Sequence, residues 1–461
     1  MHFKFIQSFR APSKEEVAEQ DLVLAALSET MNTLHETTFS ERFWSEVLGS
    51  YVRICFRQKK PLSRGVVNER RPLQDLNSPR IPGRLAVLKF DLLVVARSLR
   101  RLLTGSFVPT IDPRHSNVLV GERMSLSGVH DATVWRPRSP LPIFGNRKKR
   151  DKLEALAAQH SDAFLANVCR QLPRIYVEYF DVILNKLGKL QNASKLTFHS
   201  EHADVSSRIV LAYCREQGAR IIFYQLGGFF GEVEGYPPVW FHRRADIVRT
   251  YGWRIDEKDE PYYAIRLEEF AQLYAESDAE KKDIDLLVVY NGSINNPHLR
   301  DHYIEVTERL GTQLDSARFP SITLRPRGKT RMLSNRSQLA VLRNRISADI
   351  DAGMIHMSAL CARSSIVLHL EHPTTNFLEC VFVDQPVVAL LTNDHPTDLV
   401  VPYYEFFLAR GVMHTDIASL VEHLNSVDVE TWWAEIVQSD EYRRFKSLFA
   451  RSRKDYEKAR H

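Results

Sequence analysis

The stretch SSIVLHLEHPTTNFLECVFVDQPVVALL, residues 364–391, decides the fold class. Its apolar residues form two short runs, 366–370 and 386–391, on either side of a helical pattern at 376–383. This order predicts two parallel strands joined by a crossover helix. The same alternation continues through the second half of the chain, with strands expected at 284–290 and 321–324 and helices at 299–314, 338–346, 355–362, 403–409 and 417–424. The second half is therefore expected to be a doubly wound α/β domain, in which ligands bind at the carboxyl ends of the strands.

The first half is expected to be richer in helix. Apolar residues recur at helical spacing in three segments, at 26–34, 43–56 and 153–190. A strand–helix–strand unit follows between residues 196 and 224. Residues 255–261 are charged and poor in apolar side chains, which is typical of a linker. The expected domains are a helix-rich region plus a Rossmann-like domain at 1–255, a second Rossmann-like domain at 256–435 and a charged C-terminal helix at 436–461.

The composition of the 461 residues, 44% hydrophobic and 26% charged, is typical of soluble globular proteins and excludes disordered, fibrous and small disulfide-rich classes. No apolar run reaches the roughly 18 to 20 residues of a membrane span, and residues 1–10 lack the apolar stretch of a secretory signal. The five cysteines are scattered and form no CxxC pair, which indicates reduced thiols in a cytoplasmic protein without a zinc site. The net charge of +5 suits an anionic substrate but is too small to indicate a nucleic-acid partner.

Hydroxyl and carboxylate side chains stand where the helix after residue 370 is expected to begin. Thr374 and Thr375, together with the first helix amides, would bind a phosphate group. Glu379, one turn into the helix, could accept hydrogen bonds from a ribose diol. An ordinary helix cap explains the same residues, and the spacing alone does not decide between the two readings.

Three cations close the strand expected at 321–324. Arg325, Arg327 and Lys329 suit phosphate, because guanidinium binds it in a bidentate manner and ammonium binds it as a point charge. The alternative is a solvated turn.

A glycine-rich loop, QLGGFFGEVEG at residues 225–235, follows the strand that ends at 224. Its glycines would let the backbone approach a ligand closely, and Gln225 and Glu232 could orient or deprotonate a hydroxyl group. A tight turn without a ligand is the alternative. At the end of the preceding strand, Glu201 and His202 are candidates for a base, whereas Asp204 is better explained as a helix cap.

Two other kinds of site receive less support. The histidine pairs 298/302 and 369/372 have no third ligand nearby, so solvated or core histidines are favoured over a metal site. Residues 92–103 are amphipathic and arginine-bearing, and they could lie on an anionic membrane surface, although a buried helix is favoured.

Three segments resemble a family of sugar transferases found in bacterial surface-polysaccharide gene clusters. Residues 40–49, SERFWSEVLG, resemble that family's Tyr-Trp-x-x-Leu-x-Gly helix. Residues 218–228, GARIIFYQLGG, with YGW at 251–253, resemble its segment with Gln-His-Gly-Gly followed by Trp-Gly-Trp. Residues 374–379, TTNFLE, followed by Pro386, are similar to its segment Ser-Thr-Thr-Phe-Leu-Glu followed by Pro. The segments occur in the family's order between about residues 25 and 408.

This resemblance implies a GT-B-like, metal-independent glycosyltransferase, with two Rossmann-like domains facing a cleft, the acceptor domain first and the nucleotide-sugar domain second. It also implies similarity to enzymes that use CMP-activated sugars, in which a basic or His-Pro turn and a Ser/Thr pair hold the nucleotide. Arg325 and Arg327 stand in the place of that turn, and Thr374 and Thr375 fit the pair.

One position departs from the family. Leu226 stands where the family has histidine, and leucine can neither accept a proton nor donate to phosphate. Either His202 or Glu201 supplies that function here, or the chain is weakened as a catalyst. The segment before the Trp44 helix is also expected to be shorter than in the family or replaced.

The expected function is transfer of a sugar from a CMP-, UDP- or GDP-linked donor to a surface-polysaccharide or related glycan acceptor, free or lipid-linked, without a cofactor. The reaction is expected in the cytoplasm, with a peripheral contact to the inner face of the membrane left open. The residues expected to bind the donor are Gln225, Gly227, Gly228, Arg325, Arg327, Lys329, His372, Thr374, Thr375 and Glu379. The base is sought among Glu201, His202 and Glu232. The alternatives are a CDP-glycerol-type polyol-phosphate transferase and a non-catalytic nucleotide- or glycan-binding relative.

Overall fold

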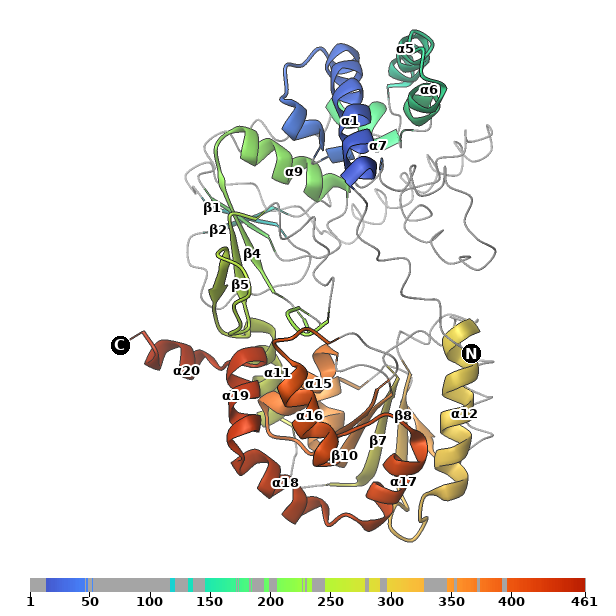
Figure 1. Ribbon diagram of the computed structural model, residues 1–461, viewed down its shortest axis with the longest axis vertical. Helices are drawn as coiled ribbons and strands as arrows, with labels where there is room; N and C mark the ends of the chain where they lie inside the picture. Colours follow the sequence, from blue (N-terminus) through green and yellow to red (C-terminus); the bar gives the residue numbers. More distant parts are fainter. Residues whose placement is uncertain are drawn as a thin grey trace, which may run out of the picture. The chain divides into compact units, whose positions relative to one another are not determined.

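The chain divides into two compact units, Met1–Phe223 and Tyr224–His461 (Figure 1). The computed structural model describes residues 14–45, 47–48, 52, 117–120, 132–135, 146–170, 172, 174–181, 184, 195–198, 205–225, 227–228, 230–233, 245–277, 282–290, 297–326, 346–351, 355–370, 374–391 and 396–460.

The second unit contains a sheet of six strands in the order β12-β11-β10-β7-β8-β9. The strands are β7 (Ile284–Tyr290), β8 (Ile322–Arg325), β9 (Asp349–Ile350), β10 (Ser364–Leu370), β11 (Val387–Leu390) and β12 (Met413–His414). All five neighbouring pairs are parallel. The chain runs outward from β7 to β9 and then returns to β10 on the other side of β7, so the topological switch point lies between β7 and β10. The expected doubly wound class is confirmed.

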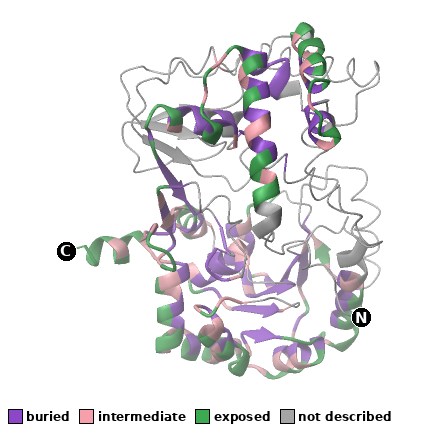
Figure 2. Cartoon of the chain, turned by 45° about the horizontal axis from the view of Figure 1, so that its top comes forward, coloured by how far each residue is buried: buried purple, intermediate pink, exposed green. Residues whose placement is uncertain are grey.

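The central strands are buried on both faces, as the purple strands of Figure 2 show. On one face Leu286, Val288 and Tyr290 of β7 share an apolar cluster with Tyr303 and Leu420. These last two belong to α12 (Pro297–Gln313) and α17 (Ile417–Ser426). A different set of helices contacts the strands elsewhere and includes α14 (Met357–Ala362), α15 (Thr375–Phe382) and α16 (Val401–Ala409). Helix α11 (Ile265–Ala275) packs on α14 and α15.

Helices at the end of the chain begin at side chains that cap them. Asp416 accepts a bond from the Ser419 amide at the start of α17, and Asp428 accepts one from the Thr431 amide at the start of α18 (Val429–Gln438). Serine caps precede α19 (Asp440–Phe449) and α20 (Arg453–Lys458). The tail expected to be helical and charged is therefore a series of short helices and not one.

The first unit combines helices with parallel strands. Its helices are α1 (Lys14–His35), α5 (Arg147–Ala157), α6 (Ala163–Arg170), α7 (Arg174–Val177) and α9 (Val205–Glu216). Strand β1 (Asn117–Val120) pairs with β2 (Ala132–Trp135) and β3 (Lys195–Phe198), and β3 pairs with β4 (Arg220–Tyr224). The helix-rich N-terminal region and the strand–helix–strand unit are confirmed. Strands β1 and β2 had no sequence prediction, because four residues are too few to show a clear period.

Two local expectations are wrong. The helical pattern at 153–190, expected to break at Pro173, also breaks before α6, where Asp162 accepts a bond of 2.7 Å from the Phe164 amide. The segment expected to be a linker at 255–261 contains a strand, β6 (Asp259–Pro261), which pairs with β5 (Ile247–Thr250). Its acidic composition is explained by a turn, because buried Asp259 accepts bonds from the amides of Ile255 and Asp256.

Candidate functional site

The N-terminus of α15 lies at the switch point of the second sheet. Helix α15 follows β10 after four residues, and its cap residue Thr374 has an extended backbone, with φ −101° and ψ −176°. The Thr374 carbonyl accepts bonds from the amides of Phe377 and Leu378, which starts the helix. The Thr374 side chain makes no capping bond to the helix. The first amides of a helix have no partner within it, so this end can bind an anion.

The glycine loop after β4 lies directly against this helix start. The Gly228 amide donates a 3.0 Å bond to Oγ1 of Thr375. A Cβ on Gly228 would lie only 2.9 Å from the Thr374 carbonyl carbon and the Thr375 nitrogen, so only glycine fits. Because the Thr375 oxygen accepts from Gly228, the Thr375 hydroxyl hydrogen can be donated to a ligand. Two segments that were predicted to bind the donor are thus in contact.

The buried side chain of Gln225 holds the first residues of this loop in place. Its Nε2 donates to the Gly227 carbonyl at 2.7 Å, and its Oε1 accepts from the Tyr251 amide and from Nε1 of Trp253, both at 2.9 Å. The side chain is 1% exposed. Gln225 was expected to touch the donor, but in this structure its polar atoms hold the loop and the 251–253 segment together.

Glu232, one of the expected bases, is completely buried. The residues around it are anchored by Thr397, whose hydroxyl donates to the Gly231 carbonyl and whose amide donates to the Glu232 carbonyl. The Glu232 carboxylate also lies close enough to Tyr404 to add to the effect of burial, which raises the pKa of that phenol.

Glu379 is buried on α15, one turn beyond Thr375. Its side chain is 7% exposed, and Oε1 lies 3.9 Å from Nε of Arg266 on α11. Its Oε2 has no hydrogen-bond partner among the described residues. Burial raises the pKa of Glu379 to about 7, although Arg266 acts in the opposite direction. Arg266 had no signal in the sequence, because a helix residue more than a hundred positions away cannot be assigned to this carboxylate from spacing.

Arg325 ends β8, the strand beside β7. Its guanidinium contacts the carboxylate of Asp351 and donates a 3.0 Å bond to the Ile355 carbonyl. Its charge is therefore already paired within the chain, at the edge of the sheet where cations were expected.

The remaining predicted residues lie outside the described part of the chain. They are Glu201, His202, Leu226, Arg327, Lys329 and His372, together with the amphipathic segment 92–103. Among the described residues, no group of three His, Cys, Asp or Glu side chains could hold a metal ion. In the same part of the chain, no helix is both long and apolar enough to cross a bilayer.

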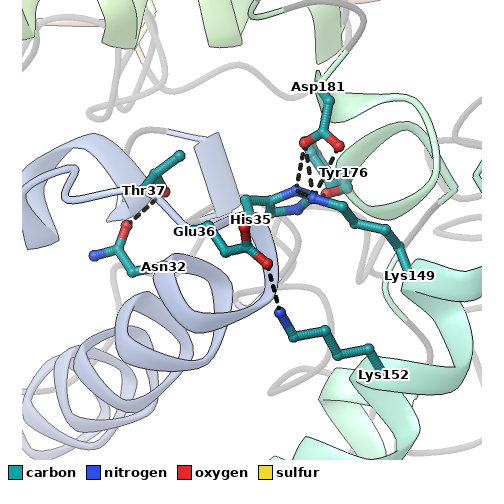
Figure 3. Close-up of polar contacts among 8 residues, drawn as sticks. All are labelled: Asn32, His35, Glu36, Thr37, Lys149, Lys152, Tyr176 and Asp181. Carbon is teal, nitrogen blue, oxygen red and sulfur yellow. Dashed lines mark hydrogen bonds and ion pairs between the residues drawn. The ribbon is translucent and has the colours of Figure 1, made fainter.

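A second polar cluster, in the first unit, joins α1 to α5 (Figure 3). Nδ1 of His35 lies 2.9 Å from Oδ1 of Asp181, Nε2 lies 2.9 Å from the Tyr176 carbonyl, and Lys149 pairs with Asp181 at 2.8 Å. Burial first, and then Lys149, lower the pKa of His35. Because a carbonyl occupies one ring nitrogen and the His35 side chain is fully buried, this His–Asp pair supports the helix packing and has no face for a substrate.

The chain was compared with curated proteins and with solved structures. No curated protein matches the sequence. Among solved structures, Anabaena Alr3699/HepE in complex with UDP and glucose is 9% identical, with a TM-score of 0.40, and the match covers 75% of this chain and 99% of that one. Acinetobacter baumannii MurG is 10% identical, with a TM-score of 0.34, and the match covers 59% of this chain and 76% of that one.

The family comparison covers more than two thirds of the chain. Residues 135–460 match the model of the LIC12162 family transferase. This range includes the glycine loop, the 251–253 segment and the start of α15, which are the parts that form the site. The chain belongs to the LIC12162 family of transferases.

Proposed function

We propose that this transferase moves a sugar from a nucleotide-activated donor, CMP-linked or UDP/GDP-linked, to a surface-polysaccharide or related glycan acceptor. The observation that carries the proposal is the contact of Gly228 with the start of α15 at the switch point of the sheet. A parallel sheet binds nucleotides at this position, and the free amides of a helix start are suited to a phosphate. The resemblance to sugar transferases of polysaccharide gene clusters supports the choice of a sugar.

In this proposal the donor phosphates lie at the N-terminus of α15. The Thr375 hydroxyl and the first helix amides donate to the phosphate oxygens, and Glu379 accepts from the ribose one turn further along. Arg327 and Lys329 would neutralise the leaving phosphate, with Arg325 assisting although it is paired with Asp351. With these cations the reaction would need no metal. Near-normal turnover of Arg327→Ala at saturating donor would remove that residue from the proposal.

The acceptor hydroxyl needs a base, and three carboxylate or imidazole groups are candidates. We assign this role to Glu201 or His202, because Glu232 is completely buried in this structure. Loss of transfer in Glu201→Gln or His202→Gln, with donor binding retained, would identify the base. Loss of transfer only in Glu232→Gln would place the base in the loop instead.

The test of donor binding is a thermal-shift panel with CMP, CDP, UDP, GDP and TDP. A nucleotide at 100 times its Kd adds about 2.7 kcal/mol to the free energy of unfolding, which raises Tm by several degrees. Thr375→Val should reduce the shift, since it removes the hydroxyl and keeps the shape. Thr312→Val, an exposed threonine on α12, is the matched control. Absence of a shift with all five nucleotides would contradict the proposal.

Product analysis separates sugar transfer from its nearest alternative. Release of CMP with formation of a phosphodiester would identify a polyol-phosphate transferase, whereas a glycosidic product would identify a glycosyltransferase. A nucleotide that raises Tm without hydrolysis or transfer to any glycan or lipid-linked acceptor would indicate a binding protein.

A further inference from the structure

The carboxylate of Glu379 is an unusual group to find buried. Its Oε2 has no hydrogen-bond partner within the described part of the chain, and its only charged neighbour there, Arg266, is 3.9 Å from Oε1. That distance permits electrostatic attraction but no hydrogen bond. A buried carboxylate with an oxygen that lacks a hydrogen-bond partner is costly when ionised, so the protonated form is stabilised. The group is therefore only partly ionised near neutral pH, in agreement with its raised pKa.

Among the described residues, the elements packed around α15 place no other charge at this carboxylate. On α15 itself, Cys380 is neutral because burial raises the pKa of its thiol, and it lies 4.0 Å from the thiol of Cys361 on α14. On α19, Lys446 pairs with Asp384 beyond the other end of α15. Strand β11, Val387–Leu390, has no titratable side chain. The ionisation of Glu379 is thus controlled by its burial and by Arg266 of α11.

Glu379 also shares one face of α15 with Thr375, because residues four positions apart in a helix are neighbours. Thr375 is the residue that contacts Gly228 at the helix start. A ligand whose anionic part lies at that start would therefore bring its next polar group to the unpartnered Oε2. A vicinal diol would supply two hydroxyl donors, which only the ionised carboxylate can fully accept.

We propose that nucleotide binding is coupled to loss of a proton from Glu379, and that Arg266 is the positioning residue that sets this coupling. The inference rests on the proposed nucleotide site and goes beyond it. In the unliganded protein part of the population carries the proton on Glu379. On binding, the ribose hydroxyls donate to the carboxylate, and the proton passes to the buffer. No covalent bond changes.

Arg266 acts from a helix outside the two predicted binding segments. Its side chain is 51% exposed, so its replacement is not expected to prevent folding. Arg266→Gln removes the positive charge and should move the ionisation of Glu379 to higher pH. Arg266→Lys keeps the charge and should restore most of the wild-type behaviour. Arg309→Gln is the matched control, because Arg309 on α12 is 47% exposed and pairs with Glu305 away from the site.

The experiment is isothermal titration calorimetry of the full chain with the nucleotide of the five-member panel that shifts Tm most, in PIPES and in imidazole at pH 6 and 7, and in HEPES and in Tris at pH 8. The difference in heat between buffers counts the protons released. We expect release of about half a proton at pH 7, nearly one at pH 6 and little at pH 8. If Arg266→Gln raises the pKa of Glu379 by about one, the variant should release more protons than the wild type at pH 7 and 8. It should also bind the nucleotide about five-fold more weakly at pH 7.

The outcomes separate this inference from the function on which it rests. Glu379→Gln should release about half a proton less than the wild type at pH 7, which assigns the proton. Binding of nucleotide by the wild type without proton release, or an Arg266→Gln profile equal to that of Arg309→Gln, would overturn the coupling and leave the nucleotide site standing. Absence of binding by all five nucleotides would overturn both.

Discussion

Gly228→Ala is the substitution that tests the candidate site most directly. The added Cβ would lie 2.9 Å from the Thr374 carbonyl carbon, 2.9 Å from the Thr375 nitrogen and 3.2 Å from the Thr374 oxygen. All three are backbone atoms, so no side-chain rotation relieves the contact. The loop must retreat by about half an ångström, which stretches the 3.0 Å bond from the Gly228 amide to Thr375. Overpacking of this kind costs about 1 to 3 kcal/mol of folding free energy.

The effect on binding should exceed the effect on stability. We expect Gly228→Ala to weaken nucleotide binding at least ten-fold, because about 1.4 kcal/mol at the phosphate position is enough for that factor. Gly218→Ala is the control: its φ of +80° makes alanine strained by about 1 kcal/mol, but no atom lies within 4 Å of the added Cβ. Urea denaturation measures stability, and calorimetry measures affinity. Wild-type affinity in Gly228→Ala would refute the placement of the donor at this helix start.

Three further predictions concern the surroundings of the site. Gln225→Leu leaves the Tyr251 amide and the Trp253 indole buried without their acceptor, and should lower the free energy of unfolding by about 2 to 4 kcal/mol in urea denaturation. The folded pKa of Glu379, about 7, exceeds its usual value of 4.5, so this group favours folding less as pH rises from about 4.5 to 7. Glu379→Gln should remove about 2.5 kcal/mol of that pH dependence, measured as the difference in unfolding free energy between pH 5 and pH 8. Asp351→Ala removes the carboxylate that pairs with the half-buried guanidinium of Arg325. It should lower the free energy of unfolding by about 3 kcal/mol, and therefore lower Tm.

The fold of the second unit was predictable because its central strands, β7 and β10, are mostly apolar runs of seven residues. The pattern at 364–391 predicted a strand, a helix and a strand, and the structure has β10, α15 and β11 there, with boundaries that differ by one or two residues. Parallel strands that are buried on both faces are continuous apolar runs, which can be recognised in the sequence. Short or polar strands cannot be recognised in this way. Strand β6 was missed because its acidic residues serve a turn at Asp259 and not a solvated linker.

The candidate site was predictable in its parts and not in its assembly. The glycine loop and the Thr374–Thr375 pair were each assigned to the donor, because each follows a strand. Their contact spans 147 positions, and nothing in local spacing predicts it. The inward role of Gln225 was missed for the same reason, since its acceptor atom binds donors 26 and 28 residues away.

The 251–253 segment explains how the glycine loop is held in place against α15. Gln225 accepts bonds from this segment on one side. On the other side Gly252, at φ +135°, lies so close to the Ser447 carbonyl at the end of α19 that a Cβ would be 2.3 Å from it. The Arg451 amide then donates to the Tyr251 carbonyl at 3.1 Å.

These contacts make the end of α19 a support for the loop, although it contributes no predicted donor-binding residue. A chain of contacts leads from the turn after α19 to the Tyr251 backbone, from there to Gln225, and from Gln225 to the glycines that lie against α15. A displacement at Arg451 is therefore transmitted to Gly227 through the Tyr251 backbone and the Gln225 side chain. Gly252 and Gly228 have the same structural requirement, close backbone approach, at the two ends of one connected support.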